Sequence, residues 1–299
     1  MITVQAENLF KSFGETKAVQ GASFEVRKGE IFGLIGPNGA GKTTIIRIIL
    51  DIFKPDKGRV LVFGGKMAEE MLDRIGYMPE ERGLYQDDVL ERCLTYLGTL
   101  KGLDPSEVKK RLDQYLEKFE LAEHRKKKVK ELSKGMQQKA QIINTILHQP
   151  ELVVIDEPFT ALDPLNVQLV KELIRELRHQ GATIIMSTHQ MHQVEELCDR
   201  ILLIDDGQDV LYGGLDEIRQ RFSGHAVLVR ALGELPSVPG VEQISTHNNA
   251  LKLTLANDVT PKDVLVSLVE KNVTLEKFEI AVPSLDEIFI RVVREENAS

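Results

Sequence analysis

The chain has 299 residues, 42% of them apolar, and its 38 Lys and Arg against 46 Asp and Glu give a net charge of −8. This length and composition predict a soluble globular protein with two domains or one large one, and the acidic balance argues against a protein that coats nucleic acid. The first ten residues do not form a signal peptide, Cys93 and Cys198 make no disulfide scaffold, and no apolar run reaches the ~18 residues of a transmembrane helix, so we expect a cytosolic protein.

The first 50 residues predict two strands, then a third strand that leads through a loop into a helix. Ile2–Phe10 and Ala22–Val26 alternate apolar and polar side chains, which is typical of antiparallel strands. Glu30–Ile35 is a short apolar run before a glycine-rich loop, as expected of a buried parallel strand. Lys42–Leu50, after that loop, is expected to be a helix.

Helical patterns replace strand patterns between about residues 87 and 149. Helices are predicted at Leu90–Lys101, Ser106–Phe119 and Met136–His148. We interpret this segment as a helical insertion in an α/β domain. Its basic run, His124–Lys130, lacks interleaved aromatic residues and lies among acids, which favours a solvated helix end or loop over a nucleic-acid site.

A βαβ unit follows the helical segment. Leu152–Ile155 and Thr183–Met186 are short β-branched runs that end in polar residues, which predicts buried parallel strands. Leu165–His179 lies between them and carries leucine at every fourth position from Leu165 to Leu177, which predicts an amphipathic helix.

The composition changes again near Ser223, because most of the 22 glycines precede this residue. We therefore predict a first domain over residues 1–222 and a small α+β accessory domain over residues 223–299. Within the second domain, strands are expected at Ala226–Arg230, Leu251–Leu255 and Thr274–Val282, and helices at Pro261–Lys271 and Leu285–Val293.

The strongest chemical motif is the glycine-rich loop. Its residues Gly36, Pro37, Asn38, Gly39, Ala40, Gly41, Lys42 and Thr43, followed by Thr44, match the phosphate-binding pattern G-x-x-x-x-G-K-[ST], or P-loop (Walker A). Glycines let backbone N–H groups wrap around phosphate oxygens, and the following helix directs its N-terminus at them. Lys42 would neutralise phosphate charge and the Thr43 hydroxyl would bind Mg²⁺. A chance match is the alternative, which the strand before the loop and the helix after it disfavour.

A second motif lies about 110 residues further on, where the strand Leu152–Ile155 ends in Asp156 and Glu157. This is the Walker B arrangement, in which the aspartate holds Mg²⁺. Glu157 would orient or deprotonate the attacking water. A strand that ends in Asp-Glu is common by itself, so the P-loop is what favours the hydrolytic interpretation.

Further short motifs surround these two. Phe13 lies 23 residues before Gly36, Val19 lies between them, Leu132–Met136 reads LSKGM, Thr160–Asp163 reads TALD, and His189 follows the strand at Thr183–Met186. In this order and spacing, residues 1–222 resemble the ATP-binding cassette (ABC) family, the motor subunits of ABC transporters. The resemblance implies the α/β fold of a P-loop NTPase (ABC ATPase) with a helical signature subdomain, about residues 87–149, and an antiparallel β subdomain.

The resemblance also implies roles for these residues. Phe13 would stack on adenine, Val19 would flank the sugar and His189 would contact the γ-phosphate. Two copies would bind head to tail, so that Ser133 and Gly135 of one copy complete the ATP site of the other. Asp163 would lie at the seam between the copies.

Simpler alternatives stay open for three of these residues. Phe13 could be a core or surface aromatic, Ser133 could be an ordinary helix N-cap, and His189 could be a buried histidine with satisfied hydrogen bonds.

The sequence departs from the family pattern at two motifs. Lys134 and Met136 stand where the signature LSGGQ has Gly and Gln, and Glu80 stands where the Q-loop has Gln. A carboxylate can ligate Mg²⁺ but cannot donate a hydrogen bond. We therefore expect Glu80 to keep the metal and coupling role, together with Thr43 and Asp156 as metal ligands.

Three segments narrow the resemblance to drug- and sodium-efflux ATPases with a C-terminal accessory domain: Pro79–Gly83, Leu132–Met136 and Pro283–Phe289. The implied protein is an ATPase subunit that binds ATP and Mg²⁺, forms a homodimer and drives export through a permease on a separate chain. It would lie in the cytoplasm at the inner face of the membrane and bind no nucleic acid. The alternatives are a soluble ABC ATPase with a non-transport target and a nucleotide-gated regulator with weak hydrolysis.

Overall fold

The computed structural model describes residues 1–81, 83–233, 235–247, 249–256 and 258–296. The chain divides into two compact units, Met1–Gly213 and Gly214–Ser299. The sequence suggested a boundary after residue 222, whereas helix α7 (Leu215–Arg221) belongs to the second unit. Within that unit, Arg219 Nε of α7 donates to the backbone oxygen of Pro283 at 3.4 Å.

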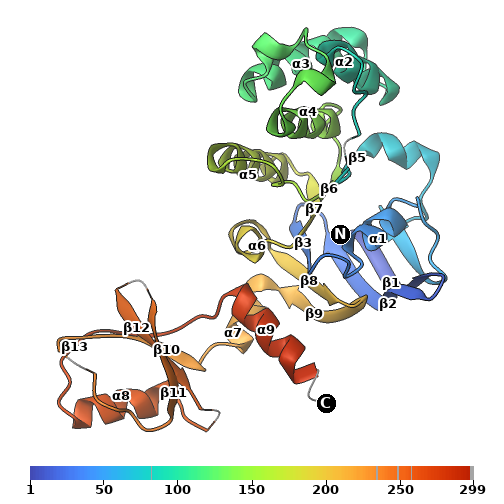
Figure 1. The fold of residues 1–299 in the computed structure, drawn as a ribbon. Coiled ribbons are helices and arrows are strands. Elements are labelled where there is room, and N and C mark those ends of the chain that lie inside the picture. Colours follow the sequence, from blue (N-terminus) through green and yellow to red (C-terminus); the bar gives the residue numbers. More distant parts are fainter. Residues whose placement is uncertain (82, 234, 248, 257, 297–299) are drawn as a thin grey trace. The chain divides into compact units, whose positions relative to one another are not determined.

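A mostly parallel sheet lies at the centre of the first unit (Figure 1). Its strand order is β5 (Ile75–Met78), β6 (Leu152–Asp156), β7 (Thr183–Thr188), β3 (Ile31–Ile35), β8 (Arg200–Asp205) and β9 (Gln208–Gly214). Neighbouring strands from β5 to β8 pair in parallel, and every residue of β3, β6 and β7 is buried. The three parallel strands predicted from short apolar runs are therefore confirmed.

Helices α1 (Lys42–Ile49), α5 (Pro164–His179) and α6 (Met191–Leu197) follow β3, β6 and β7. The helix of the predicted βαβ unit is confirmed, but the predicted apolar ladder is wrong at its start, since Leu165 is 84% exposed. The apolar residues that α5 buries are Val170, Leu173, Ile174 and Leu177. Each four-residue step turns a helix by about 400°, so a strict i, i+4 ladder drifts about 40° per step away from one face.

An antiparallel sheet completes this part of the fold, in the order β2 (Thr16–Arg27), β1 (Ile2–Phe13) and β4 (Lys57–Val62). The predicted antiparallel pair β1–β2 is confirmed, with longer strands than expected. Both sheets contribute to one buried cluster, in which Phe24 of β2 stacks on Phe32 of β3 with ring centroids 5.5 Å apart. This shared core fixes β2 beside the loop that follows β3.

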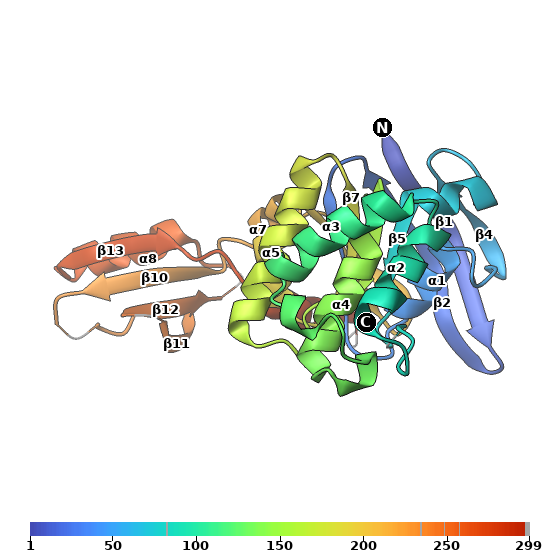
Figure 2. The ribbon, with the colours of Figure 1, turned by 90° about the horizontal axis from the view of Figure 1, so that it is seen from above.

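The helical segment contains α2 (Leu90–Leu100), α3 (Pro105–Lys118) and α4 (Lys134–Ile146), which pack against one another (Figure 2). Short 3₁₀ turns lie at Glu69–Arg74, Ala122–His124 and Val129–Glu131. Helix α4 starts two positions before its predicted start because the Ser133 hydroxyl accepts a hydrogen bond from Met136 N at 3.2 Å. In the basic run, Arg125 pairs with Glu91 at 2.6 Å.

The second unit is a small α+β domain. Its sheet has the order β11 (Val241–His247), β12 (Ala250–Leu255), β10 (Ala226–Ala231) and β13 (Leu275–Ile280), with antiparallel neighbours, and its further helices are α8 (Pro261–Glu270) and α9 (Leu285–Glu296). The predicted strands and helices of the tail are confirmed, and β11 was not predicted. Within the described part of the chain, no helix is long and apolar enough to cross a membrane.

Candidate active site

The P-loop connects β3 to α1 and depends on glycine at two close approaches. Gly36 and Gly41 have φ of 149° and 107°, and a Cβ on them would lie 2.1 Å from the Ile204 backbone oxygen and 2.2 Å from that of Ala18. Only glycine fits such positions. Lys42, at the start of α1, is buried and its Nζ donates to the backbone oxygens of Gly36 and Pro37 at 2.8 and 2.9 Å.

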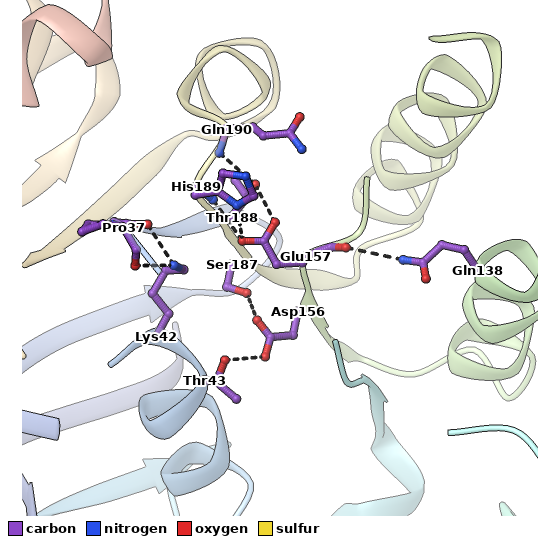
Figure 3. Close-up of polar contacts among 11 residues, drawn as sticks. Pro37, Lys42, Thr43, Gln138, Asp156, Glu157, Ser187, Thr188, His189 and Gln190 are labelled. Carbon is purple, nitrogen blue, oxygen red and sulfur yellow. Dashed lines mark hydrogen bonds and ion pairs between the residues drawn. The ribbon is translucent and has the colours of Figure 1, made fainter. Parts of the chain in front are cut away.

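Asp156 lies at the end of β6, beside the start of α1 (Figure 3). Its Oδ2 accepts a hydrogen bond from Thr43 Oγ1 at 2.8 Å, and its Oδ1 accepts one from Ser187 Oγ. Ser187 is the β7 residue paired with Asp156 in the sheet register. The parallel pairing therefore brings two hydroxyl groups to one carboxylate at the edge of the sheet where the P-loop lies.

Glu157 follows Asp156 in a left-handed backbone conformation, with φ of 52°. Its Oε1 lies 2.8 Å from His189 Nδ1 and accepts from the His189 backbone N–H at 3.1 Å, while its Oε2 accepts from Thr188 Oγ1 at 3.3 Å. Figure 3 shows this carboxylate between the end of β7 and the Lys42 side of the site. The residues after β7 thus fix the carboxylate in one orientation.

These groups line a cavity of about 710 Å³. Its lining residues are Glu15, Thr16, Lys17, Ala18, Gln20, Asn38, Gly39, Gly41, Lys42, Thr43, Thr44, Glu80, Asp156, Glu157 and Asp206. Carboxylates outnumber lysines among them, so a polyphosphate would meet an excess of negative charge unless a cation came with it. Burial lowers the pKa of Lys42, and the nearby Glu157, Asp156 and Glu80 partly oppose that shift.

The donors around this cavity fit a divalent cation bound with a nucleotide. Mg²⁺ prefers oxygen ligands and is commonly held by one or two carboxylates or hydroxyls together with substrate phosphates. Thr43 and Asp156 already present oxygen atoms 2.8 Å apart, and Glu80 lies on the lining of the same cavity. The three side chains that the sequence suggested as metal ligands therefore line one cavity, and two of them, Thr43 and Asp156, are in contact.

Two residues predicted at the nucleotide, Phe13 and Val19, are not among those that line this cavity. Phe13 is 45% exposed, packs edge-on against Phe53 with centroids 5.3 Å apart, and does not line the cavity. Val19 is 1% exposed, which leaves its side chain no surface to present to a sugar. Because strand residues alternate sides, Val19 faces the core while Ala18 and Gln20 line the cavity.

The residues expected to act on a second copy lie at helix starts outside the cavity. Ser133 caps α4, and Asp163 caps α5 by accepting from the backbone N–H groups of Leu165 and Asn166, both at 3.0 Å. The backbone N–H of Asn166 is the main cause of the lowered pKa of Asp163. A Cβ on Gly135 would lie 3.2 Å from the Ala161 backbone oxygen, so the two segments approach closely.

Sequence reasoning missed the second layer of this site. Ser187 and Thr188 hold Asp156 and Glu157, and their position directly after the buried run of β7 was the available signal. Gln138 Nε2 donates to the backbone oxygens of Glu157 and Pro158 at 3.4 and 3.3 Å, which no pattern indicated. In the predicted efflux-type segment 79–83, Arg82 lies outside the described residues.

Comparison with known families and proteins agrees with this geometry. Residues 19–160 match the family model described as ABC transporter, and residues 213–293 match the one described as ATP-binding protein DrrA1-3-like, C-terminal domain. The uncharacterised ABC transporter ATP-binding protein YhaQ of Bacillus subtilis is 40% identical over 98% of both chains. The linearmycin resistance ATP-binding protein LnrL of the same species is 32% identical over 97% of both chains.

Solved structures agree as well. A structure of the ATP-binding subunit of an ABC transporter superimposes with a TM-score of 0.69 and 33% identity, covering 74% of this chain and 93% of that one. The P-loop NTPase fold with its helical segment is therefore confirmed, and the efflux-type resemblance of the tail is borne out by the DrrA-like model. The chain belongs to the ABC transporter family, as an ATP-binding subunit that hydrolyses ATP.

Proposed function

We propose that this subunit drives export through a membrane permease on a separate chain, at the inner face of the cell membrane. The tail matches a DrrA-like C-terminal domain, and a relative of the same length is named for linearmycin resistance. Export of a toxic compound is a direct route to resistance. Among its described residues the chain has no helix long and apolar enough to cross a membrane. In the proposed assembly, the permease provides the path for the solute.

The observation that carries the catalytic assignment is the pair Asp156–Glu157 on the cavity that the P-loop lines. Glu157 acts as the general base for water, because its carboxylate is fixed by His189 and Thr188 and faces the side where Lys42 lies. His189, 46% exposed, is available to contact the γ-phosphate. Lys42 and the loop N–H groups hold the phosphates.

Thr43, Asp156 and Glu80 would hold Mg²⁺, which supplies charge neutralisation at the β- and γ-phosphates. The chain's own contribution is orientation. Ser187 and Thr43 fix both oxygens of Asp156, so the carboxylate needs little reorganisation when the nucleotide binds.

A second copy of the chain completes each site. Ser133 and Asp163 cap helices at exposed positions away from their own cavity. A helix N-terminus attracts phosphate, so these ends suit the nucleotide held by another copy. The product is a symmetric head-to-tail dimer with two ATP sites at its seam.

Co-expression with a candidate membrane permease from the same genome tests the transport function. The two proteins should purify together, and inside-out vesicles that contain them should accumulate solute when ATP is added outside. Vesicles with Glu157→Gln should not accumulate solute. Full ATP turnover by a chain that never associates with a membrane protein would instead support a soluble ATPase, and nucleotide binding without turnover in the complex would support a regulator.

A further inference from the structure

Helix α4 carries a row of polar side chains that contact the strand β5 and the loop after it. Gln141 Nε2 donates to the backbone oxygens of Pro79 and Glu81 at 2.7 and 3.1 Å. One turn later, Thr145 Oγ1 lies 3.5 Å from the Tyr77 oxygen, and His148 Nε2 lies 3.1 Å from the Ile75 oxygen. Positions 141 and 145 share one face of α4, and His148 lies in the turn that follows the helix. The three side chains contact alternate carbonyl groups from Ile75 to Glu81.

Close packing holds the helix and the strand together at the middle of this row. A Cβ on Gly76 would lie 2.2 Å from the Thr145 backbone oxygen, so any larger residue would push α4 away from β5. Gln141 is 4% exposed, which means that its two hydrogen bonds are shielded from water. Buried hydrogen bonds of this kind define a geometry more strictly than exposed ones.

Gln141 binds on both sides of Glu80. Pro79 and Glu81, which flank it in the chain, lie in irregular structure after β5. Gln141 thus donates one hydrogen bond to the backbone on each side of Glu80. The Glu80 side chain lines the nucleotide cavity, and it acts on Lys42 electrostatically.

The same helix also reaches the other acid of the site. Gln138, one turn before Gln141, donates to the backbone oxygens of Glu157 and Pro158. The two glutamines therefore tie one helix to the segments that carry Glu80 and Glu157.

We propose that Gln141 is a positioning residue for ATP hydrolysis, which fixes the loop around Glu80 so that its carboxylate faces the nucleotide and Mg²⁺. This inference rests on the proposed role of Glu80 as a metal ligand. Two anchor points on either side of one residue restrict its backbone, and a misplacement of about 1 Å at such a site can cost about 100-fold in rate.

The competing explanation is that Gln141 only stabilises the fold. Gln137 provides a matched control, because it lies on the same helix, is 5% exposed, and donates from Nε2 to the backbone oxygens of Val129 and Leu132 at 3.1 and 3.0 Å. Those carbonyls do not flank a residue that lines the cavity. Methionine replaces either glutamine with a similar unbranched shape and no donor.

The test compares Gln141→Met, Glu80→Ala and the double variant in the full chain, with Gln137→Met alone and combined with Glu80→Ala as controls. Two quantities are measured: ATP turnover, and the Mg²⁺ concentration that half-saturates Mg²⁺-dependent ATP binding in calorimetry. Gln141→Met should lower turnover about 10- to 100-fold and raise the half-saturating Mg²⁺ concentration about tenfold, as losing a partner that orients a metal ligand does. ATP affinity without Mg²⁺ should not change.

If Gln141 acts through Glu80, the double variant should be no worse than Glu80→Ala, whereas the effect of Gln137→Met should multiply with that of Glu80→Ala. Independent, multiplying effects of Gln141→Met and Glu80→Ala, or no change in the Mg²⁺ titration with Gln141→Met, would overturn the positioning role. If Glu80→Ala alone changes neither quantity, the proposed role of Glu80 is wrong, and the inference falls with it.

Discussion

Glu157 combines a strained backbone conformation with a carboxylate that its neighbours hold in place. Glu157 holds a left-handed backbone conformation, which costs a residue with a side chain about 1–3 kcal/mol and persists where the surroundings enforce it. Three donors from His189 and Thr188 provide that enforcement. The strained backbone and the fixed carboxylate together indicate that this position is built for chemistry.

Glu157→Gln should keep the fold and nucleotide binding while turnover falls at least about 100-fold, because an amide fits the same contacts but accepts no proton from water. The amide oxygen can accept from His189, and its nitrogen can donate to the Thr188 hydroxyl. The fold is checked by the unfolding temperature of the pure chain, nucleotide binding by its ATP affinity, and hydrolysis by its turnover. Unchanged hydrolysis by this variant would show that another group acts as the base.

Lys42→Ala should weaken ATP binding on the order of 10- to 100-fold, because it removes a buried cation that bonds to the loop and would bond to phosphate. Calorimetric titration with Mg²⁺-ATP measures the loss. Lys66→Ala removes an exposed lysine away from the cavity and serves as the control. Equal affinity in the two variants would contradict the P-loop as the phosphate site.

At the level of elements, the sequence predicted three buried strands of the central sheet, but not β8, whose residues 201–204 are buried as well. The runs at β3, β6 and β7 are apolar throughout and end abruptly in glycine or polar residues, so burial on both faces is visible in one segment. Strand β11 (VEQISTH) is mostly polar and lies at a sheet edge, where partner strands rather than its own composition define it.

The residues of the site also differ in how far the sequence alone could predict them. Residues joined by a local pattern, such as Gly36–Thr43 or Asp156–Glu157, were predictable because backbone chemistry ties their spacing to their task. For Val19, which is buried, one register position decides whether a strand side chain meets the core or the cavity, and the sequence does not define that position. Gln141 contacts residues 62 and 60 positions away, and no periodicity encodes such a contact.

His148, whose Nε2 contacts the Ile75 oxygen of β5, should make the free energy of unfolding depend on pH. Burial lowers the pKa of His148 to about 4, with Lys101 and Arg111 acting in the same direction and the Ile75 carbonyl and Asp73 against it. The unfolded chain takes up this proton near the ordinary pKa of about 6.5, and the folded chain only near 4, so stability falls as pH drops between these values. Thermal unfolding of wild type and His148→Gln between pH 4 and 7 measures this.

The glutamine variant removes the titrating ring while keeping an amide that can donate to the Ile75 oxygen. Its unfolding temperature should decline less steeply over that pH range than that of the wild type. Parallel curves for the two proteins would mean that His148 titrates alike in the folded and unfolded chains.

At the level of the whole molecule, the ATP sites are expected to exist only in pairs. With ATP, Glu157→Gln should form a stable dimer, which light scattering after size exclusion detects as a doubled mass. Adding Ser133→Arg should return it to a monomer, since a bulky side chain at the start of α4 would meet the partner's nucleotide. A dimer unaffected by Ser133→Arg would mean that the signature segment lies outside the interface.

Helix α4 has one further consequence in such a dimer. Its first turn, after Ser133, would face the nucleotide of the other copy, while Gln138 and Gln141 bond to the backbone of the segments that carry Glu157 and Glu80. ATP binding at one site should then change the ATP affinity of the other site through helix α4. Thermodynamic linkage makes this effect reciprocal. The two ATP molecules should bind cooperatively. The helix that contacts one ATP should also influence the rate at which its own chain hydrolyses the other.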